Sequence, residues 1–155
     1  MSSSEIAPEL YHFLNGNNLA SKQGEAMMLL TVSEEGWPHT AMISVGEIVA
    51  LSPAHLRIAL WPNTETSRNM SRTNQATLVV IYEGRAHYTR LKIASLGRVG
   101  SEGLMRDGYE ATVVWTRQDM AKYAHITSGI QIELLAPDEV ISRWTETIQS
   151  LLEET

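Results

Sequence analysis

Short apolar runs of strand length, separated by polar breaks, recur along the chain. Residues 25–32 and 38–45 form the first two runs, and the turn that carries Gly36 joins them in the pattern of a hairpin. Residues 54–61 alternate apolar and polar positions, which is typical of a half-buried strand. The remaining predicted strands cover residues 76–82, 86–99, 109–117 and 128–135.

Two of these runs are identified as strands by their β-branched side chains. Residues 76–82 (ATLVVIY) are rich in β-branched side chains, which predicts a strand that is buried on both faces. Residues 109–117 fit a helix or a strand by periodicity alone, and the consecutive β-branched and aromatic side chains from Thr112 to Thr116 favour the strand. We expect a turn or a short helical piece at residues 118–127.

Helices are predicted near both ends of the chain. Residues 7–16 form a short helix with Pro8 in its first turn and Gly16 as its stop. Residues 136–154 form an amphipathic helix, which begins at Pro137 and Asp138. The apolar stripe of this helix consists of Val140, Ile141, Trp144, Ile148, Leu151 and Leu152.

These elements predict a mainly β protein. About six or seven strands, joined mostly by short turns and flanked by helices, suit a small closed antiparallel β-barrel better than an alternating β–α sheet. The chain of 155 residues has the length of one ordinary domain, so we expect residues 1–155 to form a single domain.

Composition narrows the class of function. The net charge of −6 argues against broad nucleic-acid binding, which needs a positive surface. The chain has no cysteine, which excludes thiolate metal sites, and its five histidines lack the spacing of a metal site. Residues 1–20 lack the pattern of a signal peptide, and no apolar run is long enough to span a bilayer. We therefore expect a cytoplasmic protein without a membrane segment or a metal.

The polar break between the strands at residues 54–61 and 76–82 is unusually rich in hydroxyl, amide and guanidinium groups. Thr64 or Thr66 is placed to cap a short helix through residues 67–74. The free N–H groups of its first turn, together with Ser67 and Arg68, would then suit an anion such as a phosphate. The alternative is that Thr64 only caps the helix while the arginines of the break lie in solvent.

The order of three segments resembles the FMN-binding split-barrel proteins related to pyridoxamine 5'-phosphate oxidase. These segments are SEEGWPHT (33–40) for a hairpin, NTETSRN (63–69) for a phosphate-binding turn and RTNQATLVV (72–80) for the next strand. The likeness is clearest over residues 25–85, and residues 123–144 also resemble the C-terminal part of small bacterial members. It implies an antiparallel FMN-binding split barrel of about six or seven strands with flanking helices.

The resemblance also implies how FMN would bind. Backbone groups of Met42, Ile43 and Ser44 would lie along the edge of the isoalloxazine ring. The phosphate and ribityl chain would meet the turn, through Thr64, Ser67, Arg68 and Asn69. Members of this family pair as homodimers with the flavin at the junction, where Trp115 is our choice for a residue that reaches the partner's flavin.

Two departures from the full oxidase pattern concern the reaction. Ala41 stands where oxidases of this family carry an arginine for the phosphate, and the chain ends without their arginine-rich tail. We therefore expect an FMN-dependent oxidoreductase that acts on another small molecule rather than on pyridoxamine phosphate. No side chain is identified as catalytic, since the flavin itself would carry the electrons.

Two other functions stay open. The same barrel would serve as a non-catalytic binder or carrier of flavin or of haem, with His39 or His87 as the first axial ligands to test. A small barrel that binds nucleic acid is the least favoured, because the chain is acidic and lacks a stripe of basic and aromatic residues.

Overall fold

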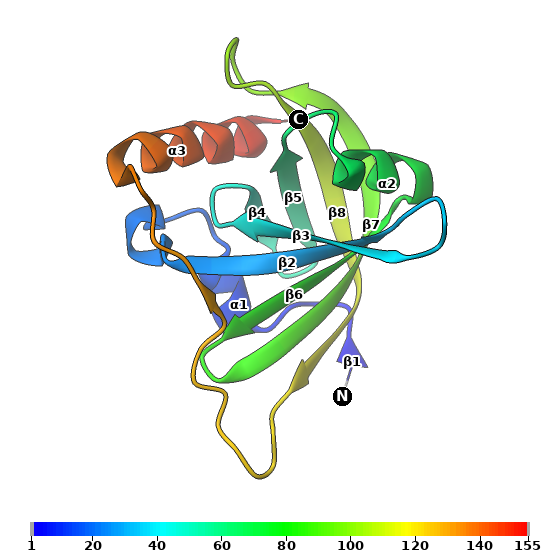
Figure 1. The fold of residues 1–155 in the computed structure, drawn as a ribbon, viewed down its shortest axis with the longest axis vertical. Coiled ribbons are helices and arrows are strands. Elements are labelled where there is room, and N and C mark those ends of the chain that lie inside the picture. The colour runs from blue at the N-terminus through cyan, green and yellow to red at the C-terminus, as the bar shows by residue number, and fades with distance from the viewer. Residues whose placement is uncertain (1, 155) are drawn as a thin grey trace.

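The computed structural model describes residues 2–154, whose strands form one antiparallel sheet (Figure 1). The strands are β1 (Ser2–Ser3), β2 (Glu25–Val32), β3 (Pro38–Ser44), β4 (Ile48–Ser52), β5 (His55–Leu60), β6 (Gln75–Tyr82), β7 (Arg85–Val99), β8 (Arg106–Asp119) and β9 (Ile130–Gln131). The helices are α1 (Pro8–Phe13), the 3₁₀ helix η1 (Leu19–Lys22), α2 (Glu65–Thr73) and α3 (Pro137–Glu153). Within the described residues, no helix has both the length and the apolar character needed to cross a membrane.

Chain connectivity rolls this sheet into an open barrel. The seven longer strands pair in the order β3-β2-β6-β7-β8-β5-β4, so β3 and β4 lie at opposite edges. Residues 45–47 alone join these two edge strands, so the edges must approach each other where β3 ends. The barrel predicted from the sequence is confirmed, and it is split because β3 and β4 meet through this turn rather than through a ladder.

The interior of the barrel holds one hydrophobic core. Leu29, Leu56, Ile58 and Leu78 are fully buried in it, on strands that alternate inward and outward side chains. Residues of β6 follow the same alternation, with Ala76, Leu78 and Val80 inside. The prediction that residues 76–82 are buried on both faces is therefore wrong, because the outer face of β6 stays partly exposed.

Helix α3 closes one end of the barrel. The guanidinium of Arg57, on β5, donates hydrogen bonds to the carbonyls of Leu151 (2.7 Å) and Glu154 (2.8 Å) and so fixes the C-terminal end of α3. Near the middle of the helix, Trp144 packs directly on Gly46. A Cβ at residue 46 would lie 2.0 Å from Cγ of Trp144, so this approach requires glycine. In the apolar stripe predicted for this helix, Trp144, Ile148 and Leu151 are buried, whereas Leu152 is 43% exposed.

The structure corrects two strand predictions. Strand β4 had no counterpart among the predicted strands; it is short, pairs only with β5 and shifts register between Ala50 and Ser52. Of the strand predicted at residues 128–135, only Ile130–Gln131 pairs, with Glu25 and Ala26 of β2. The N–H of Ile132 adds one bond, to the carbonyl of Gly24 at 2.8 Å, and the antiparallel register then carries residues 133–135 past the start of β2. The strand at residues 109–117 is confirmed within β8, which extends to Asp119 and shortens the predicted turn.

Candidate functional site

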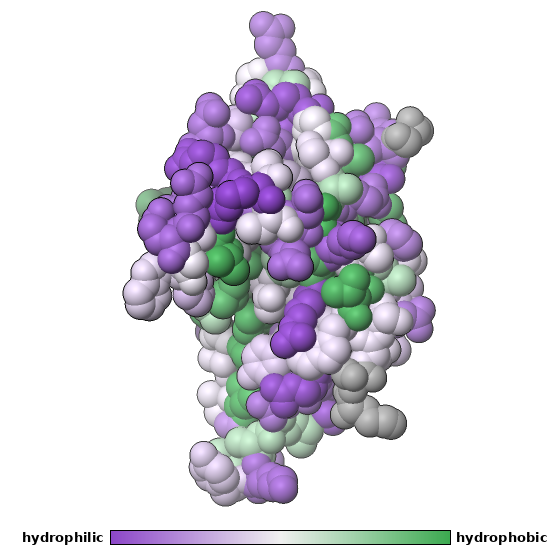
Figure 2. Space-filling view, turned by 90° about the vertical axis from the view of Figure 1, so that its right-hand side faces the viewer, coloured by the Kyte–Doolittle hydropathy of each residue, from purple (hydrophilic) through white to green (hydrophobic). Residues whose placement is uncertain are grey.

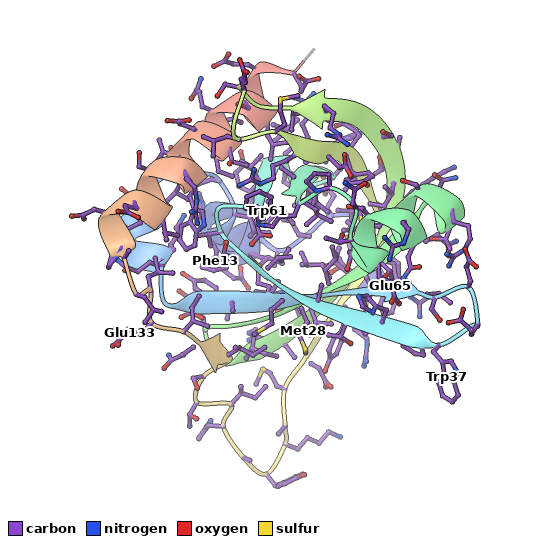
Figure 3. All side chains as sticks on the ribbon, turned by 45° about the horizontal axis from the view of Figure 1, so that its top comes forward. Phe13, Met28, Trp37, Trp61, Glu65 and Glu133 are labelled. Atoms are coloured by element: carbon purple, nitrogen blue, oxygen red, sulfur yellow. The ribbon has the colours of Figure 1, made fainter. Side chains whose placement is uncertain are left out.

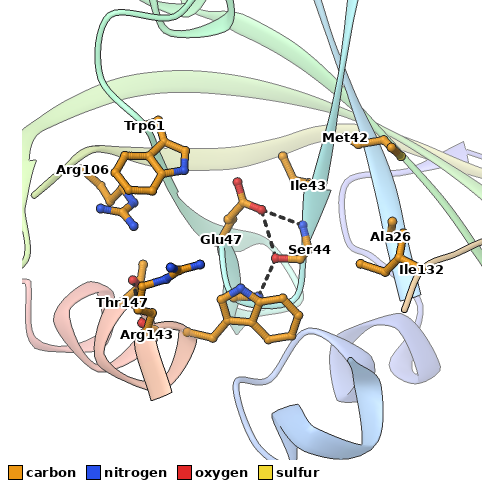
Figure 4. Close-up of a pocket in the computed structure, with 12 residues that line it drawn as sticks. Ala26, Met42, Ile43, Ser44, Glu47, Trp61, Arg106, Ile132, Arg143 and Thr147 are labelled. Atoms are coloured by element: carbon orange, nitrogen blue, oxygen red, sulfur yellow. Dashed lines mark hydrogen bonds between the residues drawn. The ribbon is translucent and has the colours of Figure 1, made fainter. Parts of the chain in front are cut away.

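A cavity of about 250 Å³ lies beneath α3, where β3 turns into β4. Met42, Ile43 and Ser44 of β3 form part of its wall, so the three predicted flavin-contacting residues of this strand share one site. Figure 4 shows Arg106 and Arg143 on the side of the cavity opposite Ala26 and Ile132, with Glu47 and Ser44 between them. Its remaining walls include the indoles of Trp61 and Trp144.

The end of β3 is shaped by Glu47. One oxygen of its carboxylate accepts hydrogen bonds from the backbone N–H (2.9 Å) and the hydroxyl (3.0 Å) of Ser44. In addition, the N–H of Glu47 donates to the carbonyl of Ser44 at 3.1 Å. Both backbone groups of Ser44 therefore point away from β2, although Ser44 lies opposite Ala26 of that strand.

This geometry determines which backbone groups of β3 are free. Along an antiparallel edge strand, alternate residues direct their N–H and C=O to the neighbour and to the open side. Since Ser44 points to the open side, Met42 does so too, and Ile43 pairs with Met27 of β2. Of the three predicted backbone contacts, Met42 offers free groups, Ser44 already bonds Glu47, and Ile43 is engaged in the ladder.

Glu47 is a partly buried carboxylate inside a polar cavity. Burial raises its pKa above the ordinary value of 4.5, while the hydrogen bonds from Ser44 and the positive charge of Arg106 oppose this rise. Its second oxygen has no hydrogen-bond donor among the described residues. A group in this position can accept a hydrogen bond from a ligand or exchange a proton with it.

Arg106 begins β8 and is only 6% exposed. Its guanidinium lies over the ring of Trp61, 3.4 Å from the ring centroid, and donates to the neighbouring carbonyl of Met105 at 3.2 Å. Within residues 2–154 it belongs to none of the ion pairs, which are His39–Glu65, Arg57–Glu110 and Arg98–Asp107. Burial and the nearby charge of Arg143 lower the pKa of Arg106, and Glu47 raises it.

The polar turn before α2 has a largely structural arrangement. Thr64 caps the helix by accepting the N–H of Ser67 at 3.1 Å, and the hydroxyl of Ser67 donates to the carbonyl of Trp61 at 3.2 Å. Arg68 is exposed and donates to the carbonyl of Asn63 at 3.2 Å. The helix and its Thr64 cap are confirmed. Of the predicted phosphate contacts in this turn, Arg68 has the most accessible side chain.

Asn69, the fourth predicted contact of the turn, is 2% exposed and joins α2 to the sheet. Its amide donates to the hydroxyl of Thr31 at 3.0 Å and its carbonyl accepts from Arg72 at 3.1 Å. Asn69 and Arg68 line a second hollow, which also contains Arg72 and the carboxylates Glu34, Glu35 and Glu65. Three carboxylates against two guanidiniums make this hollow less favourable to an anion than the cavity beneath α3, where two guanidiniums face one carboxylate.

Trp61 lines the cavity beneath α3 and lies close to the polar turn that leads into α2. It follows β5 and precedes Thr64 by three residues, and Figure 3 places it between α3 and the helix that carries Glu65. The structure thus separates the predicted site into a β3 part beneath α3 and a turn part beside α2. Trp61 connects the two parts, because its indole lines the cavity and its carbonyl accepts a hydrogen bond from Ser67 of the turn.

Sequence reasoning missed Glu47, Arg106 and Arg143. Glu47 lies in a segment without a predicted element, Arg106 between the strands predicted at residues 86–99 and 109–117, and Arg143 on the polar side of a helix. Their positions in the chain are far apart, and only the barrel and α3 bring them together. The one local signal is the VGE sequence at residues 45–47, which lies at the end of a predicted strand and combines a glycine with a carboxylate.

We predict that Glu47→Gln changes how stability depends on pH. Because the folded state raises this pKa, Glu47 contributes stability below about pH 4.5 that is lost as the pH rises through the raised value. The unfolding free energy of wild type relative to Glu47→Gln should therefore fall with rising pH, as measured by urea unfolding between about pH 4 and pH 8. Glu139→Gln, an exposed change on α3, serves as the control. A difference that stays constant over this range would contradict the assignment.

Comparisons with known proteins show which proteins share the sequence and the fold of this chain. No family model matches the chain. The uncharacterized protein YclD of Bacillus subtilis (strain 168) is 46% identical over 146 residues, which cover 94% of this chain and 95% of YclD. This identity over nearly both full lengths shows a common family.

Solved structures at low identity share the architecture. A candidate pyridoxamine 5'-phosphate oxidase from Lactobacillus delbrueckii matches with a TM-score of 0.58 at 13% identity, over 74% of this chain and 95% of that one. The HupZ protein of Group A Streptococcus matches with a TM-score of 0.55 at 12% identity, over 83% and 99%. An FMN-binding protein from Syntrophomonas wolfei matches with a TM-score of 0.51 at 11% identity, over 71% and 88%. The chain therefore belongs to the same family as YclD and has the split-barrel fold of the proteins related to pyridoxamine 5'-phosphate oxidase.

Proposed function

We propose that this protein is an FMN-binding flavoprotein that acts as an oxidoreductase on a small molecule. The observation that carries the proposal is the free edge of β3 at Met42, which lies in the wall of a cavity that also holds two indoles and two guanidiniums. A flavin ring has apolar faces and a rim of hydrogen-bonding atoms. An extended edge strand offers N–H and C=O groups to such a rim at a regular spacing.

The predicted flavin contacts would have different roles in the site. Met42 would meet the ring rim through its backbone, and Ile43 and Ser44 would shape the wall beside it. Arg68 would bind the phosphate together with the N-terminal end of α2. Thr64, Ser67 and Asn69 would support this end of the site mainly by holding the turn and helix in place.

The reaction would be a two-electron transfer to or from a small substrate, for which bound FMN supplies the redox chemistry. The chain's own groups would bind and orient the reactants, and Glu47 is the carboxyl group placed to exchange a proton with them. Ala41 replaces the arginine of the oxidases, so we do not propose pyridoxamine phosphate as the substrate. The predicted cytoplasmic location is part of the same proposal.

A homodimer is the proposed assembly, because the outer face of the sheet carries a connected apolar surface. Met42, Met28 and Val79 lie side by side across β3, β2 and β6. Figure 2 shows a band of hydrophobic surface, bordered by hydrophilic side chains, on the side of the molecule with α2 and the hairpin of β2 and β3. Met42 is 61% exposed, and an exposed apolar surface of this kind is typical of a contact between chains.

Trp115 lies on the same outer face. The register runs from Leu30 of β2 through Thr77 and Arg90 to Trp115 of β8, and the guanidinium of Arg90 lies 4.3 Å from the centroid of the Trp115 ring. A second copy packed on this face would bring its Trp115 toward the β3 edge of the first. The proposal that Trp115 reaches the partner's flavin rests on this placement.

A non-catalytic binder of flavin or haem remains the alternative, and its haem form has less support. Nδ1 of His39 lies 3.1 Å from a carboxylate oxygen of Glu65. The Nε2 of His87 has no hydrogen-bond partner among residues 2–154, but His87 is only 1% exposed inside the barrel, where burial lowers its pKa. An axial ligand there would require the barrel to open.

The FMN proposal predicts a yellow protein. Purified protein mixed with FMN and desalted should retain the visible flavin spectrum, and Arg68→Ala should weaken FMN binding by roughly tenfold, the value of one charge-assisted hydrogen bond. Riboflavin, which lacks the phosphate, should bind both proteins equally. Arg85→Ala removes the same charge at an exposed position that begins β7 and lines neither hollow, and it should leave binding unchanged. A wild-type protein that stays colourless would refute the proposed function.

The dimer proposal predicts a mass of twice the 17.3 kDa chain in sedimentation equilibrium. Met28→Glu places a charge in the middle of the apolar face and should shift the protein to the single-chain mass, because the charge would be buried in the contact. Lys122→Glu, at an exposed position between β8 and β9, is the control. A single-chain mass for wild type, or a Met28→Glu protein that stays paired, would exclude this face as the interface.

A further inference from the structure

Among the described residues, Arg106 is a buried cation that forms no ion pair. A guanidinium carries five N–H donors, and the structure assigns one hydrogen bond to Arg106, from Nη1 to the carbonyl of Met105. Removing such a cation from water is costly unless it meets an anion or several acceptors. The Trp61 ring covers one face of the guanidinium, and the other donors belong to a side chain that lines the cavity.

The surroundings of Arg106 select for a small negative group. Arg143 adds a second guanidinium from α3, and its charge contributes to the lowered pKa of Arg106. Glu47 is near enough to raise that pKa, but it forms no ion pair with Arg106 among the described residues, because its carboxylate is held by Ser44. In a chain of net charge −6, the cavity thus gathers two positive groups against one negative group.

The walls and the volume of the cavity indicate the shape of the part of the ligand that carries the anionic group. Trp61 and Trp144 contribute indole surface to the cavity, and Ile43 and Ile132 contribute aliphatic surface. The cavity volume of about 250 Å³ lies below the roughly 300–1,000 Å³ of pockets for drug-sized ligands. A flat body with one anionic group matches this combination.

We propose that the cavity beneath α3 is a binding site for a small organic carboxylate with a flat apolar body, held by Arg106 and Arg143. Arg106 would donate to the carboxylate in a bidentate manner while it stays stacked on Trp61. Arg143, exposed at the mouth, would add the second charge. The free oxygen of Glu47 would accept a hydrogen bond from a hydroxyl or amino group elsewhere on the ligand. This site deepens the proposed function by naming a substrate class, but binding of the acid requires no flavin.

Calorimetric titration of the purified protein with benzoate and benzamide tests the site. Benzamide has nearly the same shape without the charge, so benzoate should bind at least tenfold more tightly. Propionate and propionamide form a second pair for a ligand without a ring. Arg143→Gln, at an exposed position that should not affect folding, should weaken benzoate by roughly tenfold and leave benzamide unchanged. Arg106→Gln should abolish the preference, with folding checked by circular dichroism.

The outcomes separate this inference from the FMN proposal. Benzoate binding that depends on Arg143 supports the carboxylate site even in a protein that ignores FMN. If neither acid binds, if acids and amides bind alike, or if Arg143→Gln keeps full benzoate affinity, the carboxylate site is refuted whatever FMN does. If Arg143→Gln weakens FMN but not riboflavin while benzoate fails to bind, the anion in this cavity is the flavin phosphate, and the inference is overturned.

Discussion

The hydrogen bonds between Glu47 and Ser44 determine most of what is distinctive in this barrel. By taking both the N–H and the hydroxyl of Ser44, the carboxylate ends β3 and turns the chain toward β4 at the opposite edge of the sheet. The same bonds keep the carboxylate in the cavity while preventing an ion pair with Arg106. Gly46, inside this turn, allows Trp144 to pack on the backbone and so positions α3 as the roof of the cavity.

Local features of the site and fold were predictable from the sequence. The Gly36 turn, the Thr64 cap and the apolar stripe of α3 each depend on residues within a few positions of one another, and each has a specific side-chain or backbone requirement. Edge pairing was harder to predict. Strand β4 relies on one neighbour and contains a bulge, and residues 132–135 alternate like a strand although their antiparallel register carries them past the first residue of β2.

In the candidate site, too, local features were predictable from the sequence and long-range contacts were not. The sequence correctly indicated a capped helix in the polar turn, but it gave no indication that Ser67 and Asn69 would be occupied by internal hydrogen bonds. Conversely, Arg106 looks like an ordinary loop residue in the sequence, and its burial depends on Trp61 and on the closure of α3. Such groups can be found only when the three-dimensional packing shows which charges have lost their water without gaining a partner.

Backbone amide exchange at Met42 and Ile43, measured by NMR with and without FMN, tests the central claim most directly. The N–H of Ile43 pairs with β2 and should be protected in both states, whereas that of Met42 faces the open edge and should exchange fast in the free protein. The account predicts that FMN protects Met42 and leaves Ile43 unchanged. Retained FMN without any change at Met42 would contradict the proposal that the flavin lies along the free edge of β3.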